Sequence, residues 1–399
     1  MTGSEGGPTG SIAVFFSRMP DPRGDRGRRH LLSDILVIGI LAVLCGAEHW
    51  TEVEEFGRAK EAWLREFLKL PHGIPSHDIF GEVFAALDPE AFETCFRAWT
   101  AAAAGLIAGV VAIDGKTIRR SFDAATGKAA VHMVSAWAAD NGVVFGQIAV
   151  GDKSNEITAI PALLKLLRIN GLIVTIDAIG CQKDIAGQIV AQGGDYALAV
   201  KNNQPTLRRD IQELFDWAER RGFEGLRHAR SEQTEKGHGR VETRRTDMLG
   251  DLAQITDAAA WPGLRCVVRV RSERTPAGGS TRVEDRYFIS SIQTKRAEEL
   301  ARVCRAHWGV ENGLHWRLDV TFGEDSGRVR VRHAAQNLSR LRRLALNMLT
   351  LAPPPRGKTA SVKAKRFRAG LDHKYLLTIL NALARAANDP PTQPRTTSR

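Results

Sequence analysis

Two short apolar segments of this chain each run directly into an aspartate. Residues 110–113 precede Asp114 in the sequence VVAIDG, and residues 173–176 precede Asp177 in IVTIDA. Apolar runs of this length are typical of buried strands in a sheet that helices cover. In such sheets, groups that do chemistry stand at the carboxyl ends of strands, where the chain leaves the core. The two segments therefore predict an α/β sheet with an aspartate at the end of two of its strands.

The segments around these strands give the order of the sheet. The Asp140-Asn141-Gly142 turn signal predicts a hairpin between two of the strands. An antiparallel meander followed by helix–strand alternation predicts a mixed sheet with helices on its faces. After the strand at 110–113, the predicted elements are strands at 129–140 and 143–150, a helix at 155–168, a strand at 172–179, a helix at 181–194 and a strand at 195–201.

The rest of the chain differs in texture from this α/β segment. Helical periodicity dominates before residue 105 and returns after residue 292, whereas polar runs with strand character and turns rich in Gly and Pro lie between 202 and 292. The predicted organisation is a disordered N-terminus at 1–28, a helical domain at 29–104, a catalytic core at 105–201 and 293–352, a β-rich insertion at 202–292, and a basic C-terminal tail at 353–399 whose final dozen residues are disordered.

The charge of the chain indicates a polyanionic partner. There are 56 Lys and Arg against 45 Asp and Glu, a formal net charge of +11, and nucleic acid is the usual partner of such a protein. The five cysteines form no CxxC pair, which favours reduced thiols in a cytoplasm. The longest apolar run, residues 35–47, is shorter than the roughly 20 residues of a membrane-spanning helix, so we expect no membrane contact.

Carboxylates at the ends of two strands favour metal chemistry. If the strands are neighbours, Asp114 and Asp177 repel each other, and a divalent cation between them would relieve the repulsion. The alternative is that each aspartate only caps a neighbouring turn. Glu311 is a candidate for a third ligand, in a helix that also carries His307 and His315. Eight residues climb about 12 Å along a helix, so one ion cannot bind both histidines.

The motifs of this chain, taken in order, resemble those of a known family. They are RHLLSDILVIGILAVLCGAEHW, IPSHDIFGEVF, AIDGKTIRRS, DKSNEITAIPALL, TIDAIGCQKDIA, AVKNNQPTL, KGHGRVETR and HWGVENGLHWRLDVTFGED. Each is weak alone, but the ordered set resembles the ISAs-type, or H-repeat-associated, family of bacterial insertion-sequence transposases over about residues 18–385.

The resemblance implies a fold and an activity. It implies an RNase H-like catalytic core interrupted by a β-strand insertion, with a DDE triad at Asp114, Asp177 and Glu311. Two Mg²⁺ ions, which Mn²⁺ could replace, would be held by this triad. The enzyme would cleave double-stranded DNA at the terminal inverted repeats of an element and join the freed 3′ ends to target DNA. Two ends must be held together, so a homodimer is expected, in the bacterial cytoplasm at the nucleoid.

One part of the wider family pattern is missing around the last acid. Relatives with the same insertion carry Tyr, Arg, Glu and Lys at set offsets, where this chain has Cys304, His307, Glu311 and Leu318. Only the glutamate agrees, which leaves the phosphate contacts of the Arg and Lys without a match. The substitutes that we predict for these contacts are His307, Asn312 and Arg317.

Other cations are candidates for DNA contacts. Lys116, Arg119 and Arg120 follow Asp114, as suits a phosphodiester substrate, although they could also neutralise local acids. In the insertion, Arg240, Glu242 and Arg244 alternate and would share one face of a strand, as phosphate contacts or as a self-neutralised surface. The full set of predicted DNA-binding residues is Lys116, Arg119, Arg120, Lys201, His238, Arg240, Arg244, His307, Asn312 and Arg317.

Two other functions remain open on the sequence alone. One is a domesticated or inactive DNA-binding relic, and the other is a nuclease that only shares the RNase H-like core. Short inverted repeats flanking the gene would separate a transposase from both. The helical domain at 29–104 is predicted to bind those repeats, with GIPSHDIFGEVF as half of a helix-turn-helix-like pair. Packing or dimerisation is the alternative role of that domain.

Overall fold

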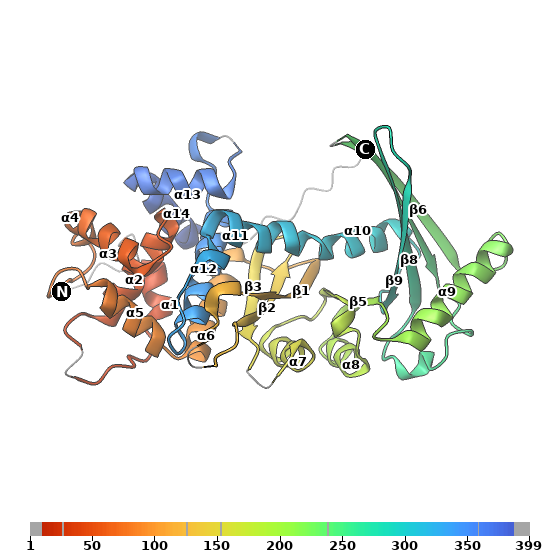
Figure 1. The fold of residues 1–399 in the computed structure, drawn as a ribbon, viewed down its shortest axis with the longest axis horizontal. Helices are drawn as coiled ribbons and strands as arrows, with labels where there is room; N and C mark the ends of the chain where they lie inside the picture. Colours follow the sequence, from red (N-terminus) through yellow and green to blue (C-terminus); the bar gives the residue numbers. More distant parts are fainter. Residues whose placement is uncertain are drawn as a thin grey trace.

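The described residues form one sheet of nine strands, which runs from the middle of the molecule to one end of its long axis (Figure 1). The computed structural model describes residues 10–25, 28–124, 127–151, 154–237, 239–357 and 359–386. The strand order is β3-β2-β1-β4-β5-β9-β8-β7-β6. The bounds are β1 Val110–Thr117, β2 His132–Ala138, β3 Val143–Ala149, β4 Ile173–Ile176, β5 Asp195–Val200, β6 His228–Gly237, β7 Arg240–Leu249, β8 Cys266–Pro276 and β9 Arg282–Ser290.

The first five strands form the mixed sheet that the sequence predicts. β1, β2 and β3 pair antiparallel, whereas β1, β4 and β5 pair parallel. Val111 and Ile113 pack with α7 (Glu156–Leu166) and α8 (Lys183–Ala191), while Val110 packs with α10 (Ala297–His307) on the other face. Helices therefore cover both faces, as the apolar runs required.

The strands between 202 and 292 continue the same sheet. After α9 (Pro205–Arg220), β6 to β9 pair antiparallel, and β9 joins β5 through pairs such as Leu198 with Ile289. The polar runs with strand character in this segment are GRVETRRTDML, LRCVVRVRSERT and RVEDRYFISSI, which form β7, β8 and β9, whereas β6 was not predicted. Its sequence HARSEQTEKG buries only Ser231, so no apolar alternation marks it, as is usual for a polar strand at a sheet edge.

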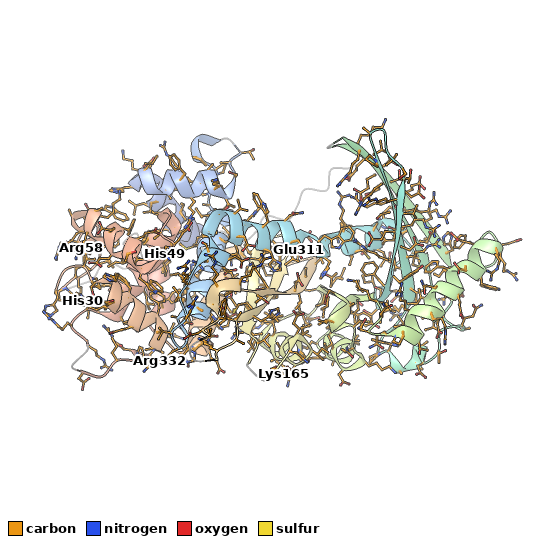
Figure 2. All side chains as sticks on the ribbon, viewed as in Figure 1. His30, His49, Arg58, Lys165, Glu311 and Arg332 are labelled. Carbon is orange, nitrogen blue, oxygen red and sulfur yellow. The ribbon has the colours of Figure 1, made fainter. Side chains whose placement is uncertain are left out.

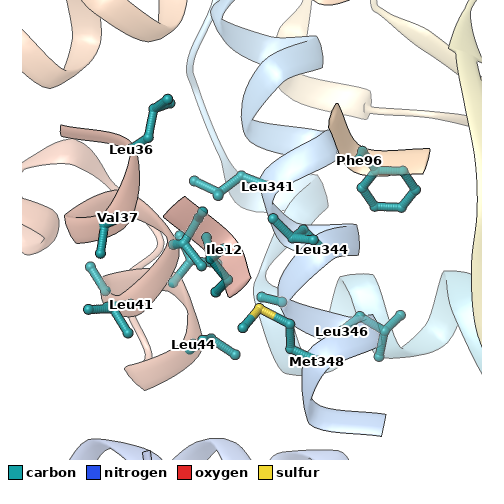
Figure 3. Packing of buried hydrophobic residues seen from close by; sticks show 14 of the residues in the cluster. Ile12, Leu36, Val37, Leu41, Leu44, Phe96, Leu341, Leu344, Leu346 and Met348 are labelled. Atoms are coloured by element: carbon teal, nitrogen blue, oxygen red, sulfur yellow. The ribbon is translucent and has the colours of Figure 1, made fainter. Parts of the chain in front are cut away.

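A helical part covers one end of the sheet, and its elements come from both ends of the chain. α12 runs through its centre, and Leu341 and Leu344 of that helix lie beside Leu36 and Leu41 of α2 (Figure 3). The helices are α1 Gly10–Phe16, α2 Leu32–Cys45, α3 Trp50–Ala59, α4 Glu61–Leu64, α5 His77–Ala86, α6 Pro89–Ala104, α12 Ala334–Leu351, α13 Val362–Leu371 and α14 His373–Ala386.

The prediction of disorder over residues 1–28 is wrong for α1. Ile12 and Phe16 are buried in the helical core, and the Phe16 ring meets the Phe92 ring edge-on at 5.6 Å between centroids. Residues 1–9, 26 and 27 lie outside the described residues. A seven-residue helix after a Gly- and Pro-rich run is too short to show a period, which explains the error.

The predicted basic C-terminal tail is also corrected, because α13 and α14 pack on the helical core. Lys365 and Arg366 are buried there, and they donate to backbone carbonyls instead of facing solvent. Lys365 Nζ lies 2.9 Å from Leu349 O, and Arg366 Nε lies 3.1 Å from Val43 O. These carbonyls belong to the last turns of α12 and α2. Carbonyl groups at that position have no hydrogen-bond donor within their own helix. The final dozen residues lie outside the described part of the chain.

Among the described residues, no single helix is long and apolar enough to cross a membrane. The pair α2 and α3 would pass by length and composition together, but the two helices bend by 97° at their junction.

Candidate active site

Asp114 and Asp177 stand side by side at one edge of the sheet. Ile113 pairs with Ile176 in the parallel ladder of β1 and β4, and each aspartate is the next residue of its chain. The two strands are therefore neighbours, which is the condition under which the two aspartates repel each other. One oxygen of each carboxylate accepts a backbone hydrogen bond, Asp114 Oδ1 from Gly115 N at 2.9 Å and Asp177 Oδ1 from Ile179 N at 3.2 Å. Asp177 thereby caps the 3₁₀ turn Ala178–Gly180, whereas Asp114 lies within β1, which continues to Thr117 instead of ending at the aspartate as predicted.

Glu311 reaches the same place from a helix that crosses the sheet (Figure 2). α10 ends at His307, a π-helical turn runs over Glu311–His315, and α11 (Trp316–Phe322) follows. The carboxyl groups of Asp114, Asp177 and Glu311 line one cleft of about 770 Å³. π-helical turns are rare and occur often at functional sites.

The charges of these acids oppose one another. Burial raises the pKa of Asp114 to about 7, and the carboxylates of Glu311 and Asp177 add to the rise. Burial also raises the pKa of Asp177, and the charge of Glu156 adds to it. A group of acids that cannot all ionise alone is the electrostatic setting that a divalent cation would satisfy.

His315 joins Asp114 and Glu311, although it was not among the predicted site residues. Its Nδ1 lies 3.6 Å from Asp114 Oδ2 and 3.6 Å from Glu311 Oε2, and one ligand atom from each of the three residues lies within 4.8 Å of the others. Burial lowers the pKa of His315 to about 4, so the ring is neutral at pH 7 and has a lone pair to offer. These residues therefore fit a divalent cation.

His307 takes a different place, as the helix geometry predicted. Its Nδ1 lies 3.3 Å from Thr175 Oγ1, and it lines the cleft beside Asp177. Burial lowers the pKa of His307 to about 4, so this ring is also neutral. The two histidines accordingly do not share one ion site.

A fourth carboxylate, Glu156, lies close to the two aspartates and was not predicted. It is the first residue of α7, and its Oε1 lies 2.6 Å from His132 Nε2, while His132 Nδ1 lies 2.8 Å from Thr117 Oγ1. A Cβ on Gly115 would come within 2.3 Å of Glu156 Oε1, so only glycine leaves room for the pair. The motif DKSNEITAIPALL was a signal for Glu156, although the residue also reads as the ordinary acid of a first helical turn.

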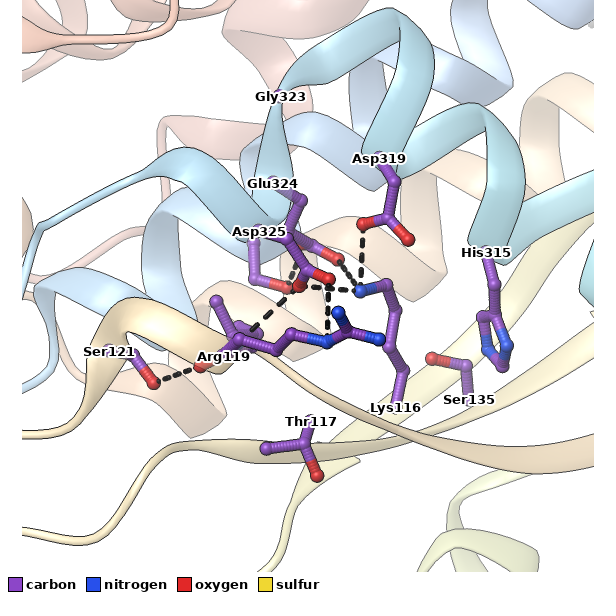
Figure 4. A network of polar contacts seen from close by, with 12 residues as sticks. Lys116, Thr117, Arg119, Ser121, Ser135, His315, Asp319, Gly323, Glu324 and Asp325 are labelled. Carbon is purple, nitrogen blue, oxygen red and sulfur yellow. Dashed lines mark hydrogen bonds and ion pairs between the residues drawn. The ribbon is translucent and has the colours of Figure 1, made fainter.

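The cations after Asp114 divide into buried and exposed groups (Figure 4). Lys116 is 8% exposed, and its Nζ lies 2.8 Å from both Asp319 Oδ1 and Asp325 Oδ1. This pairing corrects the prediction that Lys116 contacts DNA, because its charge is already neutralised inside the protein. Arg119 is 82% exposed and lies 3.3 Å from Asp325, and Arg120 is exposed.

The other predicted DNA contacts lie at various distances from the cleft. Lys201 is exposed and lines the cleft, and Asn312 is exposed beside Glu311. Arg317 does not line the cleft but lies near α13. Burial lowers the pKa of Lys365 in that helix, and the charge of Arg317 lowers it further. His238 lies outside the described residues.

The two arginines of β7 share one face with Glu242, as their alternation predicted. Glu242 is buried, and its Oε2 lies 2.8 Å from Arg244 and 3.7 Å from Arg240. Arg244 is only 17% exposed and also pairs with Glu235, whereas Arg240 is 52% exposed. Arg274 forms a further ion pair with Glu242 at 3.0 Å. Most of this charge is therefore balanced within the sheet.

Comparison with known proteins gives two family matches. Residues 106–348 match the model described as "Transposase DDE domain", and residues 13–100 match the model described as "DDE_Tnp_1-associated". The matched DDE segment contains all three acids of the cleft.

Full-length relatives are similar over nearly the whole chain. "Putative transposase YncI" of Escherichia coli O157:H7 is 39% identical over 93% of this chain and 94% of its own length. "H repeat-associated putative transposase YhhI" of Escherichia coli K12 is 40% identical over 92% of this chain and 97% of its own. Among solved structures, a piggyBac transposase synaptic complex with hairpin DNA aligns with 96% of this chain and 78% of its own, at 11% identity and a TM-score of 0.43.

Proposed function

The chain belongs to the family of transposases with a DDE domain, and from this premise we propose that Asp114, Asp177 and Glu311 are its catalytic triad. One observation carries the proposal: three acids from separate segments of the chain line one cleft, and burial together with mutual repulsion raises the pKa of Asp114 to about 7. Isolated caps of turns would have no reason to converge in this way.

Mg²⁺ is the cofactor that we propose, with Mn²⁺ as a substitute. Carboxylate oxygens suit both ions, and the neutral ring of His315 adds a nitrogen that Mn²⁺ accepts well. Two such ions held by the triad would lower the pKa of an attacking water or 3′-hydroxyl and would stabilise the leaving oxygen.

The side chains around the triad have parts of their own in this proposal. Asp114 and Asp177 are fixed by the hydrogen bonds from Gly115 and Ile179, so little reorganisation is needed when substrate binds. Lys201 on the rim of the cleft would attract the phosphodiester, and the neutral ring of His307 could donate a hydrogen bond to a phosphate oxygen. Asn312, exposed beside Glu311, would contact the DNA strand next to the cut.

The fold proposed for the catalytic core is RNase H-like. The strand order β3-β2-β1-β4-β5, with an antiparallel meander and two parallel strands, supports it. In this proposal the core comprises residues 105–201 and 293–352, residues 202–292 are an insertion, and residues 29–104 are a helical domain associated with DNA binding.

The proposed substrates are the terminal inverted repeats of a mobile element and a target duplex, cut and joined by phosphoryl transfer. Holding two ends together requires two active sites, so a homodimer is the proposed active form. The relatives come from bacteria, and the enzyme would act on DNA in the cytoplasm at the nucleoid.

The test uses the full chain with a duplex that ends in the element's own repeat. Asp114→Asn, Asp177→Asn and Glu311→Gln should each lower cleavage and strand transfer roughly a thousandfold or more in Mg²⁺, since each removes one ligand charge at nearly constant volume. DNA binding should persist in all three. Asp184→Asn, an exposed acid on α8 outside the cleft, is the matched control and should keep its activity. A triad variant that still cleaves at the wild-type rate would remove that residue from the triad.

A further inference from the structure

Three arginines stand close together in an irregular segment that the function above does not use. Residues 328–332, here called the arginine segment, read Arg-Val-Arg-Val-Arg between the 3₁₀ turn Glu324–Ser326 and α12. Arg328 and Arg332 are exposed, and Arg330 is partly exposed. We propose that the arginine segment, together with Arg120, binds the phosphate backbone of the DNA that enters the candidate active site. This inference rests on the proposed function and adds a binding surface to it.

The backbone of the segment is held in place from one side by a lysine. Lys128 Nζ donates to the carbonyl oxygens of Arg330 and Arg332, each at 2.7 Å. His333 N donates to Ala85 O at 3.2 Å, which ties the end of the segment to α5. A surface that is ordered before binding loses less conformational entropy when it binds.

The side chain of Arg330 is oriented as well. Its guanidinium carbon lies 5.4 Å from the centroid of the Phe122 ring, and its Nε donates to Arg120 O at 3.3 Å. A guanidinium stacked on a ring and bonded at Nε keeps its two terminal nitrogens for another acceptor. This hydrogen bond brings the guanidinium of Arg330 against the backbone of Arg120 and so joins the two segments.

One residue of the segment has a strained backbone. Arg332 has φ +41°, a left-handed value that non-glycine residues rarely adopt. Such strain is found most often where a segment serves binding or catalysis. Here it is compatible with a backbone that Lys128 and α5 hold from both sides.

The charges of these arginines are not balanced within the described part of the protein. No ion pair joins Arg120, Arg328, Arg330 or Arg332 to a carboxylate of the described residues, although Arg119 beside them pairs with Asp325. In the insertion, by contrast, arginines pair with nearby acids, as in Arg271 with Asp285 at 2.7 Å and Arg245 with Glu232 at 2.9 Å. A set of ordered, unpaired guanidinium groups is what phosphate binding requires.

A groove of about 670 Å³ runs along the segment. Arg328 and Arg330 line it, and so do the acids Asp78 and Glu82 of α5 and Asp123. Phosphates would be attracted to the arginine side chains and repelled by these acids. Figure 2 shows Arg332 where the helical part meets the sheet.

The segment lies within reach of the triad on a single duplex. Arg120 lies six positions after Asp114, and a fully extended chain of that length spans at most about 20 Å. One helical turn of B-DNA is roughly 34 Å long, so a duplex cut at the triad could contact the arginines within the same turn. Lys116, paired with Asp319 and Asp325, fixes the connection between the two places.

The test measures the affinity of the full chain for DNA at several salt concentrations. It uses a duplex of about 30 bp, which is roughly three helical turns, and no divalent metal. Arg328, Arg330 and Arg332 are replaced by Ala together, and the slope of log K against log [KCl] should flatten by about 0.9 for each lost phosphate contact. The control replaces Arg168, Arg220 and Arg296, which are exposed elsewhere and change the net charge equally. Lys at all three positions of the segment should restore most of the slope. An unchanged slope in the alanine variant would overturn the proposal, as would equal losses in the control.

A second experiment does not depend on removing the arginines. Val331 is 66% exposed in the middle of the segment, and Leu106 is 76% exposed before the start of β1, at the opposite end of that strand from Asp114. Each is changed to Cys in a Cys45→Ala background, labelled with a photoreactive group and mixed with the same duplex. Val331→Cys should crosslink to DNA and Leu106→Cys should not, and equal yields would overturn the proposal.

The outcomes separate this inference from the proposed function. Wild-type protein that binds no DNA would contradict both. If the alanine variant loses dimer by sedimentation while its salt slope stays unchanged, the segment is a protein interface and the DNA proposal is wrong. Loss of cleavage in the triad variants with an unchanged salt slope in the alanine variant would keep the proposed function and reject only the arginine segment.

Discussion

His132 and Glu156 face each other across Gly115, with 2.6 Å between His132 Nε2 and Glu156 Oε1. The charge of this glutamate raises the pKa of both Asp114 and Asp177, although burial is the larger cause for each. Glu156 therefore adds negative potential where a divalent cation would bind, and the histidine holds its carboxyl group in one orientation.

Glu156→Gln should weaken Mn²⁺ binding to the full chain by about 10- to 100-fold, which is the usual effect of a group that supports metal ligands. The binding is measured by calorimetry at fixed pH. His132→Gln keeps the carboxylate charge and serves as the matched variant, with a smaller loss. Wild-type affinity in Glu156→Gln would show that the fourth acid has only a capping role in α7.

The contribution of Asp114 to the stability of the metal-free protein should fall as the pH rises from about 4 to about 7, whereas His307 and His315, whose pKa burial lowers to about 4, contribute in the opposite direction up to their unfolded pKa near 6.5. The folded-state pKa of Asp114 is raised to about 7, whereas in the unfolded chain it is near 3.8, so between these values only the folded state binds the proton. Stability from this group is complete below the unfolded pKa and is lost as the pH passes the folded one. Thermal melts in EDTA across this range measure the effect.

Two comparisons isolate the contribution of Asp114 in those melts. Buried Glu93, whose pKa is raised to about 7, contributes in the same direction as Asp114, and His307 and His315 contribute in the opposite one, so the contribution of Asp114 is the difference in pH slope between wild type and Asp114→Asn. Asp114→Asn should melt higher than wild type at pH 7 without metal, and Mg²⁺ should raise the melting temperature of wild type but not of the variant. A lower melting temperature for Asp114→Asn under these conditions would contradict the assignment.

Lys116 should matter for stability more than for DNA binding. Its ammonium is buried with Asp319 and Asp325, and Glu324 lies 3.9 Å away. Lys116→Met leaves these acids without their partner, which should cost about 3–5 kcal/mol of unfolding free energy. Arg119→Met is the control: its ion pair with Asp325 is exposed, so its loss should cost less than about 1 kcal/mol. Denaturant titration of the two variants decides between a structural lysine and a surface one.

The sequence was most informative where burial leaves a continuous apolar run. The end of β4 before Asp177 followed from such a run, because a strand covered on both faces admits no polar residue until it leaves the core. β1 continues past Asp114 to Thr117, since it still pairs with β2 there. β6 could not be found in this way. It is held at the edge of the sheet by backbone hydrogen bonds to β7, and its mostly exposed side chains leave no apolar pattern in the sequence. α1 was missed because a helix of seven residues is too short to show a period, even though Ile12 and Phe16 are buried.

The candidate site was predicted only in part, because its neighbours come from distant segments. Glu156 and His132 belong to α7 and β2, and only the pairing of β1 with β2 brings them over Gly115. His315 was set aside on the geometry of an α-helix, which holds for its distance from His307 but not for its contacts with Asp114 and Glu311. Lys365 and Arg366 were predicted to be solvent-exposed cations, because the carbonyl oxygens that accept their hydrogen bonds belong to other helices and are not evident from the local sequence.

The two arginines of β7 should differ in their effect on DNA binding. Arg240 is 52% exposed and lies 3.7 Å from Glu242, so it can turn to a phosphate, whereas Arg244 is held by Glu242 and Glu235. Arg240→Ala should flatten the salt dependence of DNA binding by about one unit. Arg244→Ala should leave the slope unchanged and lower the melting temperature. The reverse pattern would show that Glu242 positions Arg244 for DNA.

The helical residues 29–104 should not fold as an isolated fragment. Their core also contains Leu341 and Leu344 of α12, Leu376 and Ile379 of α14, and Ile12 of α1, none of which belongs to that fragment. Without these partners the fragment exposes much of the apolar surface whose burial stabilises the fold. Circular dichroism should therefore show a weak helical signal without a cooperative melt, while the full chain melts cooperatively. A fragment with a sharp melt would contradict this prediction, and the binding of terminal repeats could then be footprinted with residues 29–104 alone. If the fragment does not fold, repeat binding is tested with the full chain, by substitutions at exposed positions of α5 such as His77.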